Sequence, residues 1–312
     1  MKLIKPSWKI LEQEPGINGI YKAIERAGRT CYKSEDKITE DSAKGFVDRM
    51  IKSGHGSMLE HGTVYLLYSA NCYSRSDLEF INKYISNPYS KVICMGSDDD
   101  LVEQTDKNIY SGDIWGTGVY GNTVYAITTN YRALIENNWL NDLEYLCEPT
   151  EYHVKRITVR FVCDRGVSHE FVRHRVFSFA QESTRYCNYS SNKFNNELTF
   201  IMPPQFPEST WQQQEAFMQV CKASEDYYIA LLGKWDDRKE DKRFKTGFKD
   251  NPWKPQEARA VLPNSLKTEL VMTGFVSDWK HFFELRCAPN AHPSARELAI
   301  PLSEEFVKKG LV

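Results

Sequence analysis

Apolar residues recur at helical spacing along much of the chain. In the stretch 40–54 they form one face, made of Ala43, Phe46, Val47, Met50 and Ile51, and Gly54 ends the run. Apolar positions three and four residues apart predict an amphipathic helix, and glycine is a frequent helix stop. Similar patterns predict helices over 17–29, 128–138, 139–147, 167–175, 208–233, 255–262, 278–286 and 293–309.

Other stretches alternate polar and apolar residues, which predicts strands. Over 156–163, Ile157, Val159, Phe161 and Cys163 share one face. Further strands are expected at 63–69, 197–202 and 266–272, with an edge strand at 9–11. Helices and strands follow one another without a regular β-α-β rhythm. We therefore expect an α+β fold, with a mixed or antiparallel sheet packed against long helices.

The stretch from 70 to about 122 has the least regular pattern. Its glycines at 112, 116, 118 and 121 lack the strand–loop–helix context and the closing Gly-Lys-Ser/Thr of a phosphate-binding P-loop. A surface insertion is the better interpretation. The lysine-rich residues 234–251 are expected to form a mobile loop.

Composition narrows the class of protein. The 312 residues suffice for one or two domains, and 40 basic against 42 acidic residues leave a formal charge of −2. That balance argues against a nucleic-acid coat protein. No apolar stretch approaches the roughly 20 residues needed to span a bilayer, and the N-terminus has no signal core. We expect a soluble cytoplasmic protein without membrane contact.

The cysteines do not indicate a metal site. Eight are present and none is spaced Cys-x-x-Cys, so a zinc site is not expected. In a reducing compartment most of them are expected to be small buried apolar residues.

Residues 173–186 concentrate the candidate chemistry. They read Arg-His-Arg-Val-Phe-Ser-Phe-Ala-Gln-Glu-Ser-Thr-Arg-Tyr. Three arginines beside three aliphatic hydroxyls suit a ligand with several phosphates, such as a nucleotide or dinucleotide. A basic, solvated helix face is the alternative, but the interleaved Val176, Phe177 and Phe179 favour partial burial. A protein that binds RNA or DNA through phosphates and base stacking is a second alternative.

The segment 173–186 resembles the signature of the flavin-dependent thymidylate synthases. That signature is Arg-His-Arg, seven residues, a serine, and then x-Arg-Tyr. Four further stretches resemble family blocks and follow in the same order: Arg29-Thr-Cys31-Tyr32, Gly54-His55-x-Ser57-x-x-Glu60-His61, Ala258-Arg259-Ala-Val-Leu-Pro263 and His281-Phe-Phe-Glu-Leu-Arg286. The blocks cover about half of the chain. The resemblance implies the family's α+β fold.

The resemblance also implies an activity and its partners. Family members make dTMP from dUMP, with methylenetetrahydrofolate as carbon donor and reduced FAD as hydride donor. NADPH reduces the flavin again. The implied assembly is a homotetramer whose active sites are shared between subunits, and no nucleic acid or metal takes part.

Family position assigns roles to particular residues. Arg286 is the implied catalytic residue, which stabilises negative charge on the uracil ring. The implied cofactor contacts are His55, Ser57, Arg173, His174, Arg175, Gln181, His281 and Asn290. The implied substrate contacts are Glu170, Arg173, Gln181, Glu182, Ser183, Thr184, Arg185, Arg259 and Arg286. The plainer alternatives are an ordinary helix-terminal arginine at 286 and a structural histidine at 174.

The chain departs from the family pattern in charge and in length. Gln181 stands where a carboxylate is usual, and Glu170 where a glutamine is usual. A relative that binds flavin and a pyrimidine nucleotide but no longer methylates, or transfers a different one-carbon group, therefore stays open. Between His61 and Arg173 the family needs only a short hairpin. We expect one catalytic domain over 1–312, with a family-atypical insertion at 70–155.

Overall fold

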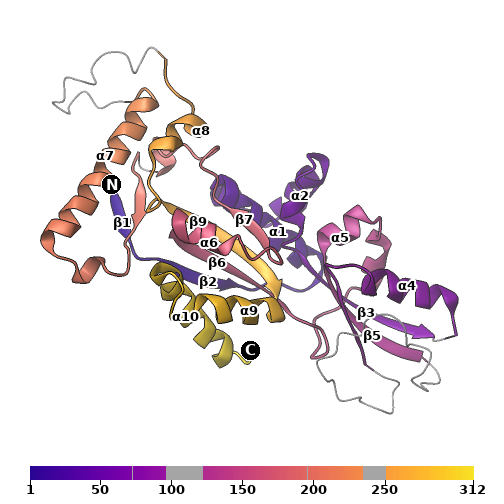
Figure 1. Ribbon diagram of the computed structural model, residues 1–312. Coiled ribbons are helices and arrows are strands. Elements are labelled where there is room, and N and C mark those ends of the chain that lie inside the picture. Colours follow the sequence, from indigo (N-terminus) through magenta and orange to yellow (C-terminus); the bar gives the residue numbers. More distant parts are fainter. Residues whose placement is uncertain (72, 96–121, 195, 235–250) are drawn as a thin grey trace. The chain divides into compact units, whose positions relative to one another are not determined.

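Figure 1 shows the computed structural model, which describes residues 1–71, 73–95, 122–194, 196–234 and 251–312. Contacts divide the chain into two units. The first consists of Met1–Leu11, Arg26–Ile38 and Thr158–Val312, and the second of Glu12–Glu25 and Thr39–Ile157. Helix α1 (Gly16–Tyr32) contributes to both.

The first unit contains a four-stranded sheet in the order β2-β6-β9-β7. Its strands are β2 (Ser7–Leu11), β6 (Arg156–Asp164), β9 (Lys267–Phe275) and β7 (Ser178–Gln181). Strand β2 pairs with β6, and β7 with β9, both antiparallel. Val159, Phe161 and Cys163 on β6 are fully buried, which confirms the predicted apolar face.

Helices cover both faces of this sheet. The C-terminal end of α1 lies on one side, and α9 (Val276–Arg286) and α10 (Pro293–Lys308) lie on the other (Figure 1). The core beneath α9 is aromatic: the Phe161 and Phe171 rings lie 5.0 Å apart, and Phe282 lies 5.0 Å from Phe171. Gly274 is required here, because a Cβ at this position would lie 2.5 Å from the Phe177 ring. Close packing therefore fixes the turn that carries Phe177.

A second core of the first unit lies around helix α7 (Trp211–Leu231), which begins with a capping box at Thr210 and Gln213. The parallel pair β1 (Lys2–Ile4) and β8 (Thr199–Ile201) adjoins it. The fully buried side chains of this second core include Leu198, Phe200 and Tyr228. Short helices α8 (Pro255–Ala258) and η7 (Arg259–Val261) follow. Among the described residues, other single turns are η1 (Glu35–Lys37), η4 (Asn192–Phe194) and η5 (Phe206–Glu208).

The second unit is built on an antiparallel sheet in the order β3-β5-β4, with β3 (Thr63–Asn71), β5 (Asn122–Asn130) and β4 (Lys91–Cys94). Its helices are α2 (Ser42–Lys52), α3 (Gly56–Leu59), α4 (Arg75–Ile85), α5 (Tyr131–Glu136) and η3 (Leu140–Tyr145). The Tyr84 hydroxyl donates to Asp142 at 2.6 Å, and the Lys83 ammonium pairs with the same carboxylate. These contacts give the stretch 75–145 buried interactions of its own. That 70–155 is an insertion stays a prediction.

The α+β class is confirmed by this mixture of mainly antiparallel sheets and helices. Several boundaries were wrong. The irregular stretch after 70 contains α4 and β4, and the helix predicted from 128 begins only at Tyr131, because Thr128, Thr129 and Asn130 pair with β3. The glycines at 112–121 and most of the lysine-rich loop lie outside the described residues.

The cysteines are of mixed exposure. Cys163, Cys187 and Cys221 are buried as expected, whereas Cys94 is exposed, and the other described cysteines are half-buried. No helix formed by the described residues is both long and apolar enough to cross a membrane.

Candidate active site

The Arg-His-Arg triplet lies on a turn between α6 (Arg165–Phe171) and β7. The predicted helix over 167–175 begins earlier and ends earlier than expected. The Asp164 carboxylate accepts from the Val167 amide at 2.6 Å, which caps the helix start. The chain must then leave the helix to pair β7 with β9. As a result Arg173 and Arg175 are exposed, while His174 is buried between them.

Arg286, the last residue of α9, contacts this turn. Its Nε donates to His174 Nε2 at 2.9 Å. Its two terminal nitrogens donate to the Glu170 carboxylate at 2.5 Å and to the Glu170 carbonyl at 2.6 Å. Three of its five N–H donors are thus used within the described residues. The guanidinium is held rigidly, with donors left for a ligand.

His174 is neutral at physiological pH. Burial, the adjacent Arg286 and the nearby His281 lower the pKa of its imidazole to about 4. Because Nε2 accepts from Arg286, we assign the ring proton to Nδ1. The neutral ring can therefore orient Arg286 without repelling it.

We expect His174 to make stability depend on pH. Its folded pKa lies below the ordinary value of 6.5, so its contribution is fully present above about pH 6.5. The contribution is lost as pH falls towards about 4. Histidine NMR titration should show this low pKa, and Arg286→Met should raise it because a neighbouring positive charge is removed. A titration near 6.5 in the parent protein would contradict the buried geometry.

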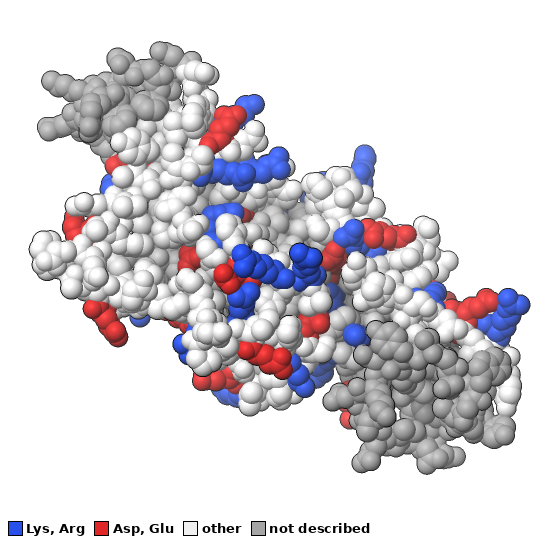
Figure 2. Space-filling model, in the orientation of Figure 1, with Lys and Arg blue, Asp and Glu red and all other residues white. Residues whose placement is uncertain are grey.

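The loop after β7 carries the predicted phosphate contacts. The Ser183 amide donates to the Cys31 carbonyl at 3.0 Å. Thr184 Oγ accepts from Arg259 at 3.2 Å, which joins two residues 75 positions apart. Arg185 is exposed, beside the ring of Tyr186. Figure 2 shows Lys and Arg side chains gathered over the part of the first unit where α6 and β7 lie.

Gln181 and Glu182 lie deeper than the loop. The side-chain amide of Gln181 donates through Nε2 to the Ser168 hydroxyl at 2.9 Å and to the Thr268 hydroxyl at 3.3 Å. The Glu182 carboxylate is buried, with the Lys267 ammonium at 2.8 Å and the Tyr189 hydroxyl at 2.9 Å. Gln181 is therefore anchored beside α6, and both oxygens of Glu182 have protein partners.

The remaining predicted contacts are exposed. His281 lies on α9, with its ring centroid 6.3 Å from that of His174, and Asn290 lies in the turn after α9. His55 and Ser57 lie at the start of α3, in the second unit. The structure thus joins Arg286 to Glu170 and His174, and Arg259 to Thr184, by direct contact. Within the described residues no cluster of histidine, cysteine or acidic side chains is arranged to hold a metal ion.

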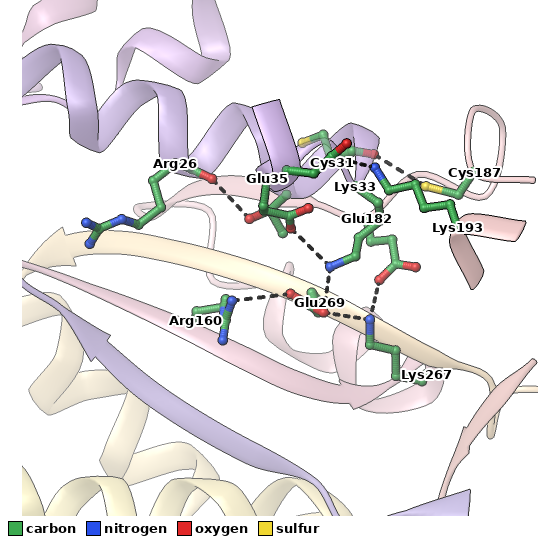
Figure 3. A network of polar contacts seen from close by, with 12 residues as sticks. Arg26, Cys31, Lys33, Glu35, Arg160, Glu182, Cys187, Lys193, Lys267 and Glu269 are labelled. Atoms are coloured by element: carbon green, nitrogen blue, oxygen red, sulfur yellow. Dashed lines mark hydrogen bonds and ion pairs between the residues drawn. The ribbon is translucent and has the colours of Figure 1, made fainter. Parts of the chain in front are cut away.

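A network of charged residues beneath the loop was not foreseen (Figure 3). Lys267 bridges Glu182 and Glu269 at 2.8 and 2.6 Å, and Lys33 bridges Glu269 and Glu35 at 2.7 and 3.0 Å. Burial raises the pKa of Glu269, but Lys267 and Lys33 outweigh it and hold the value at about 2. The available signal was the alternation of Lys267 and Glu269 on one face of a strand whose other residues are uncharged.

The fold and these contacts lie mostly in a stretch that a family model recognises. The model described as thymidylate synthase complementing protein matches residues 123–309. The chain belongs to this family. Curated relatives carry the name flavin-dependent thymidylate synthase: one from Mycobacterium sp. (strain JLS) is 32% identical over 178 residues, covering 56% of this chain and 64% of the relative.

Other relatives match similarly. The flavin-dependent thymidylate synthase of Geobacter sulfurreducens is 29% identical over 138 residues, 44% of this chain and 50% of that protein. The chain thus spans between half and two thirds of the length of these relatives. A solved structure described as a UMP/dUMP methylase PolB from Streptomyces cacaoi bound with 5-Br dUMP aligns over 99% of this chain and 93% of its own, at 15% identity and a TM-score of 0.40.

Proposed function

We propose that this protein is a flavin-dependent thymidylate synthase, which methylates dUMP to dTMP with methylenetetrahydrofolate as carbon donor and NADPH as reductant. One observation carries the proposal. Arg286, the catalytic residue by family position, contacts His174 of the signature at 2.9 Å although the two are 112 positions apart. A buried neutral imidazole and a carboxylate fix the guanidinium. Preorganised donors of this kind stabilise charge that develops in a transition state.

The proposed cofactor is FAD, which when bound supplies the hydride. Arg173 and Arg175 fit its phosphates, since both are exposed and neither side chain has an ion pair or hydrogen bond within the described ranges. Free guanidinium forks at one turn are suited to a pyrophosphate. Buried His174 holds the turn between them. His55, Ser57, Gln181, His281 and Asn290 keep their proposed cofactor contacts by family position.

The proposed dUMP site uses two groups of residues. Ser183, Thr184, Arg185 and Arg259 would hold the 5′-phosphate, with the Arg259–Thr184 contact already formed at 3.2 Å. The remaining donors of Arg286 would bind the pyrimidine N3–C2–O2 edge and stabilise negative charge there. Glu170 sets the orientation of Arg286 through its carboxylate and its carbonyl.

The proposal includes an assembly. The family resemblance supports a cytoplasmic homotetramer with shared active sites, and size measurement in solution tests it. Within such an assembly the second unit, with His55 and Ser57, keeps its proposed part in flavin binding.

Tritium release from [5-³H]dUMP tests the function. We expect purified protein to be yellow and to release tritium as water only when methylenetetrahydrofolate and NADPH are both present. Yellow protein that binds dUMP without release would identify a relative that no longer methylates. Colourless protein that binds neither flavin nor dUMP would overturn the proposal and favour the nucleic-acid alternative.

A further inference from the structure

Glu182 connects the proposed phosphate loop to the buried charge network. It directly precedes Ser183, and its residue is 1% exposed. Its carboxylate accepts from Lys267 at 2.8 Å and from the Tyr189 hydroxyl at 2.9 Å. Its amide donates to the Glu269 carbonyl at 2.8 Å. In Figure 3, Glu182 and Glu269 both point towards the Lys267 ammonium, between the end of α1 and the sheet.

The loop has a second tether to the same region. The Ser183 amide donates to the Cys31 carbonyl at 3.0 Å near the end of α1. Two residues after Cys31, the Lys33 ammonium forms an ion pair with the Glu269 carboxylate at 2.7 Å. Lys33 has a positive φ of 47°, which turns the chain out of α1. Strand β9 and α1 therefore hold the start of the loop from two sides.

Stability alone does not account for so many buried charges. Burying an ion pair costs desolvation energy, and well-packed apolar residues often do as well or better. What such a pair adds is geometry, since a salt bridge with further hydrogen bonds fixes the direction of both side chains. Here the fixed element is the backbone that enters Ser183, Thr184 and Arg185.

We propose that Glu182 and Lys267 are positioning residues that set the 183–185 loop for the 5′-phosphate of the nucleotide. This inference rests on the proposed function and deepens it. Glu182 acts through the loop, since both of its carboxylate oxygens already have protein partners. Lys267 neutralises a carboxylate that would otherwise repel a phosphate bound one residue away. An error of about 1 Å in such a loop is enough to weaken its contacts to a ligand.

The test compares dUMP with deoxyuridine, which lacks the phosphate. We expect Glu182→Ala to raise the Kd of dUMP at least tenfold and to change that of deoxyuridine less than twofold. Glu182→Gln should restore most of the dUMP affinity, because an amide can accept from Lys267 and donate to the Tyr189 oxygen. A role in stability alone would weaken both ligands together.

Two further variants keep the test decisive. Tyr189→Phe removes one tether with little change in shape, so a phosphate-specific loss of about threefold is expected even if Glu182→Ala folds poorly. Glu35→Ala is the matched control, because Glu35 belongs to the same charge network but its carboxylate contacts only Lys33 among the described residues, at 3.0 Å, and not the 183–185 loop. Parental dUMP affinity in both Glu182→Ala and Tyr189→Phe would overturn the inference. Failure of the parent protein to bind dUMP would instead overturn the proposed function.

Discussion

Replacing Arg286 by alanine is expected to lower the turnover of dUMP by about 10²–10³-fold while the protein keeps its flavin. A preorganised donor aimed at developing charge typically has an effect of this size. Arg286 is 13% exposed at its side chain and is held on three donors by His174 and Glu170. Its charge is thus fixed before the ligand arrives, so little reorganisation is needed during the reaction.

Two variants control this experiment. Arg286→Lys keeps the charge but loses the planar fork, so we expect it to recover only part of the activity. Lys280→Ala removes a cation from an exposed position of the same helix and should leave turnover unchanged. Flavin absorbance and thermal unfolding show whether each variant is folded. Parental turnover in folded Arg286→Ala protein would remove the catalytic assignment.

Lys267→Met is expected to lower the free energy of unfolding by about 3–5 kcal/mol. Removing one partner of a buried ion pair leaves the other charge uncompensated, and this is more costly than never having buried the pair. The charge left behind is that of Glu182, whose carboxylate keeps the hydrogen bond from the Tyr189 hydroxyl at 2.9 Å but loses its ammonium partner. Glu269 is affected less, since Lys33 still pairs with it. Urea denaturation measures the change.

The double variant Lys267→Met with Glu182→Leu separates charge from packing. We expect it to regain much of the stability lost in the single variant, because both buried charges are then absent. Lys193→Met is a suitable control, since Lys193 pairs with Asp36 at the surface and exposed pairs contribute little. A loss below about 1 kcal/mol in Lys267→Met would show that water reaches the network.

Strong periodicity carried the sequence prediction furthest. The alternation on β6 placed Val159, Phe161 and Cys163 correctly in the core, and the helical runs located α1, α2, α7, α9 and α10. Short elements carried no such signal. Strand β7 has four residues, which are too few to show a period. The helix predicted over 167–175 was extended across the Arg-His-Arg turn, which lies after the end of α6 at Phe171. A pattern of apolar positions shows which face of a helix or strand is buried only when the element is long enough for the pattern to repeat.

The sequence alone determined which chemical groups are available: the arginines and hydroxyls of 173–186, Arg259 and Arg286. It also carried the family resemblance, which the match of the family model to residues 123–309 confirmed. Only the folded chain decided how they are used. It turned Glu182 inward onto Lys267 and joined Arg286 to Glu170, 116 positions away. The physical reason is that partners of buried polar groups are set by strand pairing and helix packing between distant segments, which no local pattern encodes.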